Sequence, residues 1–123
     1  MAEHNDFGKV AEELATDFLV KSGYKILLKN YRYLKAEIDI IAEFENQIII
    51  VEVKARTTDA FIEPHEAVNK RKIKLIVSAA DFFIQENKID KNVRFDIISV
   101  LPNELGKLEI KHFINAFESI DAN

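Results

Sequence analysis

The segment Gln47-Ile-Ile-Ile-Val-Glu-Val-Lys54 decides how this sequence folds. Five of its eight residues are β-branched, which favours a strand buried on both faces of a sheet. Glu52 and Lys54 interrupt this apolar run with opposite charges, and because only one residue separates them their side chains share one face of the strand. Burying an unpaired charge is costly. These two charges therefore pair, bind an ion or lie at an open strand end.

The residues before this segment predict a hairpin that leads into it. Residues 37–43 alternate apolar side chains with Asp39, as a strand does. Residues 44–46 suit a short hairpin loop, and the aromatic and aliphatic stretch from 24 to 31 predicts a further strand. Folding the two hairpin strands together brings Asp39 near Glu52. The sequence thus predicts two carboxylates side by side in a sheet.

Two amphipathic helices are predicted by apolar residues at intervals of three and four. The first covers Asn5–Ser22, and the second resumes this spacing from 67 to about 87, after a polar loop at 57–64. Two more strands follow, at Val93–Leu101 and Leu108–Phe113. The order α-β-β-β-α-β-β predicts an α/β sandwich, in which helices flank a central mixed sheet and the second helix forms a strand-helix-strand crossover.

Length and composition limit the classes of protein. A chain of 123 residues suits a single domain, here 1–123 with a core from about 7 to 113. No apolar stretch approaches the ~20 residues that a membrane-spanning helix needs. The absence of a secretory signal pattern and of any cysteine predicts a cytoplasmic protein. With no thiolates and only three scattered histidines, any bound metal should be a hard ion held by oxygen.

The predicted Asp39 and Glu52 pair has the chemistry of a metal site. Adjacent carboxylates repel one another, and a divalent cation relieves that repulsion. Mg²⁺ takes oxygen ligands and is commonly held by one or two carboxylates plus substrate phosphate. Lys54 is placed to orient a water or to stabilise charge at phosphorus, and Glu12 on the first helix is a further candidate ligand. A plain cross-strand ion pair explains the same spacing without any metal.

The charge of the chain argues against indiscriminate binding to nucleic acid. Its net charge is −4 and its isoelectric point about 5.4, whereas the phosphate backbone favours a positive surface. A locally basic face is nevertheless predicted around the second helix. The residues expected to contact nucleic acid there or beside the site are Lys72, Arg56, Lys70 and Arg32. The alternative interpretation, without a functional role, is that the helix lysines form a solvated face.

Two further groups of residues are predicted to play no part in the site. Asp96 is expected to be structural, paired with Arg94 two residues away on the same strand face. The three histidines, at positions 4, 65 and 112, show no spacing typical of metal ligands. We expect them at the surface.

The spacing Asp39-x₁₂-Glu52-Val53-Lys54 resembles the D-(x)ₙ-(D/E)-x-K signature of the PD-(D/E)XK superfamily, which includes restriction enzymes and archaeal Holliday-junction resolvases. More specifically, the chain is similar to the bacterial YraN family, uncharacterised protein family 0102, from about residue 7 to 100. Five blocks carry this likeness in order. They are Gly8, Glu12 and Ala15; Asn30, Arg32, Glu37, Ile38 and Asp39; Val51 to Arg56; Ala67, Val68 and Lys72; and Arg94, Phe95 and Asp96. Ala11 and Ala36 stand where the family has glycine.

The resemblance implies a restriction-endonuclease-like fold and a metal-dependent endonuclease. Asp39, Glu52 and Lys54 would be catalytic, and Mg²⁺ or Mn²⁺ would be held by Asp39, Glu52 and Glu12. The implied substrate is DNA rather than RNA, in branched or damaged form, and a homodimer would supply the two active sites that a junction requires. The alternative is a catalytically weak or inactive nucleic-acid-binding module on the same fold. A structural protein is a third hypothesis.

Overall fold

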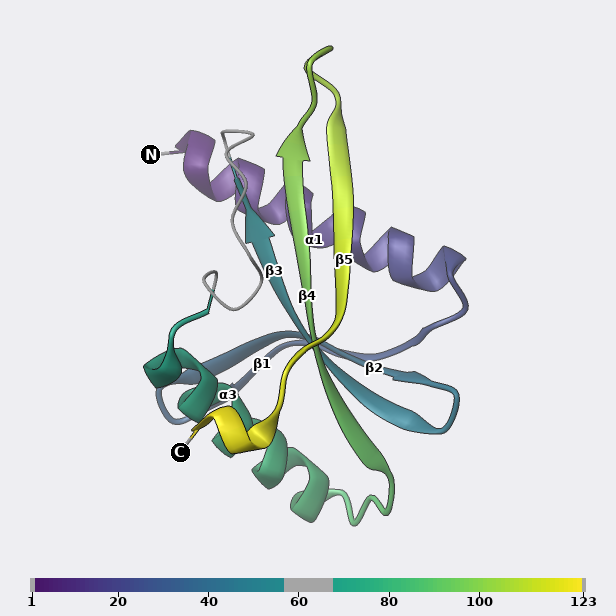
Figure 1. Ribbon diagram of the computed structural model, residues 1–123, viewed down its shortest axis with the longest axis vertical. Helices are drawn as coiled ribbons and strands as arrows, with labels where there is room; N and C mark the ends of the chain where they lie inside the picture. Colours follow the sequence, from purple (N-terminus) through teal and green to yellow (C-terminus); the bar gives the residue numbers. More distant parts are fainter. Residues whose placement is uncertain (1, 57–67, 123) are drawn as a thin grey trace.

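The computed structural model describes residues 2–56 and 68–122, which are drawn in colour in Figure 1. Its elements are α1 Ala2–Lys21, β1 Lys25–Tyr33, β2 Ala36–Phe44, β3 Gln47–Ala55, α3 Lys70–Glu86, β4 Asn92–Pro102, β5 Leu108–Phe117 and the 3-10 helix η1 Ser119–Ala122. Apart from η1, this is the order predicted from the sequence. The predicted polar loop and His65 lie outside the described residues.

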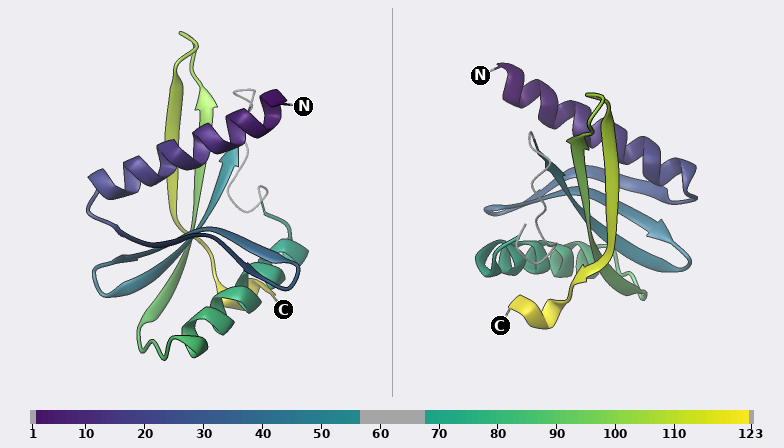
Figure 2. Two further views of the ribbon diagram at one scale, coloured as in Figure 1. Left: turned by 180° about the vertical axis from the view of Figure 1, so that it is seen from behind. Right: turned by 45° about the horizontal axis from the view of Figure 1, so that its top comes forward.

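In the described part of the chain, the five strands form one mixed sheet in the order β1-β2-β3-β4-β5. Neighbouring strands are antiparallel except β3 and β4, which run parallel because the chain passes through α3 between them. The two helices lie on opposite faces, each over its own hydrophobic core (Figure 2). The predicted α/β sandwich with a crossover is therefore confirmed.

Each helix forms because one side of it is apolar. In α1, Ala11, Ala15 and Leu19 recur every four residues and are fully buried against the sheet. In α3 the buried stripe consists of Ile73, Ile76, Ala79, Ala80 and Phe83. The Asn69 side chain caps the start of α3 by accepting the Lys72 backbone N–H at 2.9 Å. Among the described helices, none is long and apolar enough to cross a membrane.

The sheet opens between β2 and β3, and this opening positions the site. The two strands pair from Phe44–Gln47 to Ile40–Val51 and no further. Beyond that point β2 stays with β1, and the β1–β2 hairpin diverges from β3 (Figure 1). A buried backbone N–H needs an acceptor, and the Val53 N–H donates to Asp39 Oδ2 at 2.8 Å instead of to β2. Asp39 therefore lies where the strands part.

The two hairpin turns contain residues with positive φ. Glu45 and Asn46, between β2 and β3, have φ of 49° and 64°, which is the backbone of a tight two-residue hairpin. In the β1–β2 turn the positive φ falls on Leu34, at 56°, and Ala36 is outside this conformation. An alanine in place of glycine at position 36 therefore causes no backbone strain.

Both edge strands of the sheet carry irregularities. In β1 the register shifts between Ile26 and Leu28. Opposite β5, it shifts between Phe95 and Ile97, where Asn115 has a φ of 55° and its N–H donates to the Asp96 side chain. The bulge lets β5 continue to Phe117, four residues past the predicted end. An alternating apolar pattern does not reveal the two extra residues of this bulge, so the predicted strand was too short.

Candidate active site

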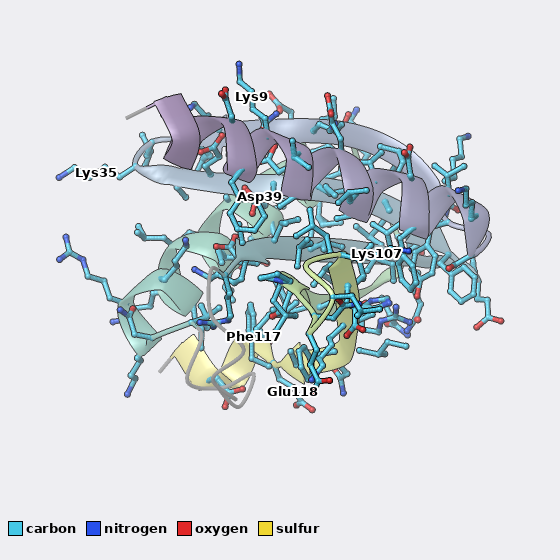
Figure 3. All side chains as sticks on the ribbon, turned by 90° about the horizontal axis from the view of Figure 1, so that it is seen from above. Lys9, Lys35, Asp39, Lys107, Phe117 and Glu118 are labelled. Carbon is cyan, nitrogen blue, oxygen red and sulfur yellow. The ribbon has the colours of Figure 1, made fainter. Side chains whose placement is uncertain are left out.

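A cleft of about 370 Å³ lies where β2 leaves β3 and α3 begins. It is lined by Lys35, Ala36, Glu37, Asp39, Glu52, Asn69, Arg71, Lys72, Leu75 and Ile76. In Figure 3, Asp39 points into the space between α1 and α3, whereas Lys35 extends outward from the turn before β2. Residues from two strands and a helix thus share one opening, as the predicted proximity of Asp39 and Glu52 requires.

Asp39 is a carboxyl group with little to stabilise its charge. Among the residues that the structure describes, the Val53 N–H is its one hydrogen-bond donor. Burial, and next the negative charge of Glu52, raise the pKa of the Asp39 carboxyl to about 7, although the Val53 hydrogen bond acts in the opposite direction. A positive ion in the cleft would offset the repulsion from Glu52, which is the second of these causes.

Glu52 is 5% exposed and is compensated by two lysines. Lys72 Nζ lies 2.5 Å from Glu52 Oε2, and Lys54 Nζ lies 3.5 Å from the same oxygen. Burial lowers the pKa of Lys54 despite the nearby Glu52 charge. At Lys72, burial also acts to lower the pKa, but the hydrogen bond to Glu52 and the negative charges of Glu52 and Asp39 together raise it above its ordinary value. Lys72 is therefore the stronger ion-pair partner of Glu52.

Glu12 approaches the site from α1, on the other side of Asp39. Burial raises the pKa of Glu12, and the charges of Glu37 and Glu52 add to the effect. The Glu12 charge in turn contributes to the raised pKa of Asp39. Within residues 2–56 and 68–122, however, no three acidic or histidine side chains gather closely enough to hold one ion together. Metal binding by Glu12, directly or through water, stays a prediction.

The structure divides the predicted nucleic-acid contacts. Lys72 lines the cleft, whereas Arg32 is 75% exposed beside it and pairs with Glu37 at 3.8 Å. Lys70 is exposed at the start of α3, and Arg56 follows β3. Their contact with nucleic acid stays a prediction.

Four polar residues of the cleft were absent from the predicted site residues: Lys35, Glu37, Asn69 and Arg71. Asn69 stands three residues before Lys72, as a helix cap does, and this spacing could have identified it. Arg71 belongs to the locally basic face that was predicted around the second helix. Lys35 gave no such signal, because only the tertiary fold brings the β1–β2 turn beside α3.

A second buried carboxylate lies on the opposite face of the sheet. Asp96 is fully buried and accepts from Arg94 Nε and Nη2 at 2.9 and 2.8 Å. The predicted pairing with Arg94 is thus confirmed. The Asn115 N–H donates at 3.0 Å, and His112 Nε2 lies at 2.7 Å. Burial acts to raise the pKa of Asp96, but these hydrogen bonds together lower it below its ordinary value.

The predicted surface position of His112 is wrong. Its side chain is 10% exposed and its ring lies edge-on to Phe18 and Tyr24. Arg94 extends this cluster through a 2.6 Å hydrogen bond from Nη2 to the Tyr24 hydroxyl. A lone histidine in a strand carries no local signal of burial, and here the partner is sixteen residues away on the neighbouring strand.

Comparison with known proteins adds family context. Residues 11–100 match the model of "Uncharacterised protein family UPF0102". A UPF0102 protein of Flavobacterium psychrophilum is 48% identical over 95% of this chain and 98% of that protein. One from Bacteroides thetaiotaomicron is 46% identical over 95% and 96%. The SfsA protein of Pyrococcus furiosus, solved in complex with Ca²⁺, aligns with a TM-score of 0.45 and 11% identity over 89% of this chain, which spans 63% of that protein.

Proposed function

This chain belongs to the uncharacterised protein family UPF0102, and we propose that it is a metal-dependent endonuclease that hydrolyses phosphodiester bonds in DNA. One observation carries the proposal: Asp39, Glu52 and Lys72 line one cleft at the point where β2 and β3 separate, and the Lys54 amine lies 3.5 Å from Glu52. A protein that needed only a stable sheet would gain nothing from two neighbouring carboxylates. Branched or damaged DNA is the proposed substrate, and a cytoplasmic location, favoured by the absence of cysteine, belongs to the same proposal.

The donor atoms of the cleft fit a hard divalent cation. Asp39 and Glu52 offer carboxylate oxygens, the ligands that Mg²⁺ and Mn²⁺ accept, and Mg²⁺ commonly uses one or two carboxylates with water and substrate phosphate completing its shell. Burial and the charge of Glu52 raise the pKa of Asp39, and a nearby cation would favour its ionised form. Mg²⁺ or Mn²⁺ in this place supplies Lewis acidity that polarises a phosphoryl oxygen and activates water.

The side chains of the cleft divide the remaining work. Lys54 reaches Glu52 from the same strand face, and its lowered pKa suits a group that orients a water or shares its proton. Lys72 and Arg71, from α3, are placed to bind phosphate oxygens. Arg32, exposed beside the cleft, would extend this contact along the strand. Positive charge is thereby concentrated locally on a chain whose net charge is −4.

A catalytically inactive nucleic-acid-binding module is the second candidate. The pairing of Glu52 with two lysines favours it, because that carboxylate is compensated without any metal. The acidic net charge favours it as well, since a nuclease that cleaves without sequence specificity usually gains affinity for DNA from a basic surface. In either case a homodimer would present two clefts to one DNA junction.

A cleavage assay separates the two candidates. Linear, flapped and four-way-junction DNA are incubated with Mg²⁺ or Mn²⁺ and either the wild type or Glu52→Gln, with Glu45→Gln in the exposed β2–β3 turn as the matched control. The nuclease proposal expects cleavage by wild type and Glu45→Gln and none by Glu52→Gln. Salt-dependent binding without cleavage of any substrate would support the binding module instead.

A further inference from the structure

Glu52 is held by two lysines that act on the same oxygen atom. Lys72 Nζ is 2.5 Å and Lys54 Nζ 3.5 Å from Oε2. The carboxylate is nearly inaccessible to solvent, so these ammonium groups take the place of water beside its charge. A divalent cation ligated by Glu52 needs the lone pairs of the same carboxylate. Cation and lysine therefore compete for one group.

The charge in the cleft opposes addition of a cation while both lysines stay in place. Two ammonium groups already face the carboxylates of Asp39 and Glu52, and a divalent ion would add two further positive charges. Binding becomes favourable if one ammonium group leaves or if an anion enters. A phosphodiester does both, because it brings a negative charge and offers the departing ammonium a new partner.

Lys72 is the lysine that is free to leave. The Lys72 side chain is 43% exposed and lines the cleft. The Lys54 side chain is 25% exposed and belongs to β3, where its backbone pairs with Ser99 of β4. The backbone at Lys72 is fixed independently of its side chain, because its N–H is held by the Asn69 cap. The Lys72 amine can thus change partners without any change in α3.

We propose that Lys72 is a displaceable counter-ion of Glu52. In the free protein it holds the carboxylate and weakens cation binding there. When nucleic acid enters the cleft, the Lys72 amine transfers to a phosphodiester oxygen and Glu52 becomes available to the cation. Because coupling between two ligands is reciprocal, substrate and cation each strengthen the binding of the other. This inference rests on the proposed function, since it takes Glu52 as a metal ligand, and it makes Lys72 a positioning residue.

Titration with Mn²⁺ in the absence of nucleic acid tests the competition. The signal of free Mn²⁺ in electron paramagnetic resonance gives its dissociation constant for wild type, Lys72→Met and Lys72→Arg. Methionine keeps the apolar stem and removes the charge. We expect Lys72→Met to bind Mn²⁺ about tenfold more tightly, within the usual range of coupling between sites, and Lys72→Arg to stay near the wild type. Lys74→Met, which removes an exposed charge from the same helix, should change nothing.

An affinity of Lys72→Met that is equal to or weaker than that of the wild type overturns the proposal. A merely structural role for Lys72 would lead to that result, because loosening the site weakens a ligand. Glu52→Gln, made in the wild type and in Lys72→Met, distinguishes failure of the counter-ion role of Lys72 from failure of the proposed function. If Glu52→Gln abolishes Mn²⁺ binding but Lys72→Met does not tighten it, only the counter-ion role fails. If binding survives Glu52→Gln, the metal site itself is elsewhere and both fail.

Transfer of Lys72 to phosphate is tested with sodium dimethyl phosphate, a diester that lacks sugar and base. At equal ionic strength to a sodium chloride control, it should tighten Mn²⁺ binding by the wild type more than binding by Lys72→Met, in which only the negative charge of the diester can act. An equal effect on both variants would show that the diester acts without Lys72 and would overturn the transfer.

Discussion

Asp39 and Asp96 are two carboxylates of one sheet whose pKa values burial acts to raise, yet their polar neighbours differ. Asp96 has four polar contacts, including both ends of an arginine fork, and its pKa is lowered. Within residues 2–56 and 68–122, Asp39 has one donor, the Val53 N–H, its neighbours Glu52 and Glu12 are acidic, and its pKa is raised. In the register of the sheet Asp96 faces Val51, one residue before Glu52, so the two environments are close together on opposite faces.

The difference shows how a structural acid can be told from a candidate catalytic one. A carboxylate with a complete set of donors is stabilised by the protein itself, and removing it leaves those donors unpaired. A carboxylate with one donor and an acidic neighbour is a net cost to the fold unless a cation joins it. The contrast between Asp39 and Asp96 therefore predicts opposite responses to the same substitution, aspartate to asparagine.

The largest expected effect is the loss of stability on substitution of Asp96. Asp96→Asn keeps the shape but leaves Arg94 as a buried, poorly compensated charge, which should lower the free energy of unfolding by about 3–5 kcal/mol. Urea denaturation measures it, with Asp17→Asn on the exposed face of α1 as control. Because the folded pKa of Asp96 is lowered, its contribution is present above the unfolded pKa and is lost as the pH falls through the folded value. A loss no larger than that of Asp17→Asn would contradict the structural role.

Divalent cations should stabilise the protein through the Asp39 side alone. At a hundredfold excess over its Kd, Mg²⁺ bound only by the folded state adds about 2.7 kcal/mol to the free energy of unfolding. Asp39→Asn should abolish this gain, whereas Asp17→Asn should keep it. Thermal denaturation with and without Mg²⁺ gives both values. An equal gain in Asp39→Asn and wild type would place the ion elsewhere.

Without metal, Asp39→Asn should stabilise the protein at high pH. A carboxyl group with a folded pKa near 7 and an ordinary value of 3.8 binds more protons in the folded than in the unfolded state between these values. Wild-type stability from this group therefore falls as the pH rises from about 4 to 7. The free energy of unfolding of Asp39→Asn, relative to that of the wild type, should therefore be higher at pH 8 than at pH 4 by on the order of 2 kcal/mol. Urea denaturation in a chelating buffer measures this difference. A difference independent of pH would show that Asp39 ionises normally.

The smallest expected effect concerns DNA binding. If Lys72 contacts one phosphate, Lys72→Ala should flatten the dependence of log K on log salt by about one unit on duplex DNA. Lys111→Ala, on the exposed side of β5 near the Asp96 cluster, should leave the slope unchanged. Fluorescence anisotropy across a salt series measures both. Equal slopes in wild type and Lys72→Ala would remove α3 from the binding surface.

Most of the fold could be predicted because its periodicities are local. The β-branched run of β3 and the apolar stripes of α1 and α3 each signal their own element, and Asp39, Glu52 and Lys54 stood out as charges in apolar strands. The separation of β2 from β3 could not be predicted in this way. It depends on a side chain that replaces a strand carbonyl as acceptor for the Val53 N–H, and no spacing in the sequence encodes that exchange.

Contacts between residues that are distant in sequence were the second feature that the sequence could not predict. The sequence suggested a phosphate contact for Lys72. In the structure Lys72, on α3, is the nearest cation to Glu52, which lies twenty residues earlier in the chain, on β3. His112 was likewise assigned to the surface, although Asp96 and two aromatic rings enclose it. In both cases the tertiary fold, and not the local pattern, determines the role of the side chain.

The bulges in the two edge strands affect how copies of this protein can associate. An exposed, regular edge invites a second sheet to continue it, with hazards of fibre formation and unplanned pairing. Here the register breaks near Ile26 in β1 and beside Asn115 in β5, and the Asn115 N–H is already committed to Asp96. Continuous sheets across two molecules are thereby disfavoured at both edges. A dimer that sets two clefts on one DNA is accordingly expected to meet through side-chain surfaces, leaving the backbone ladder of each copy closed.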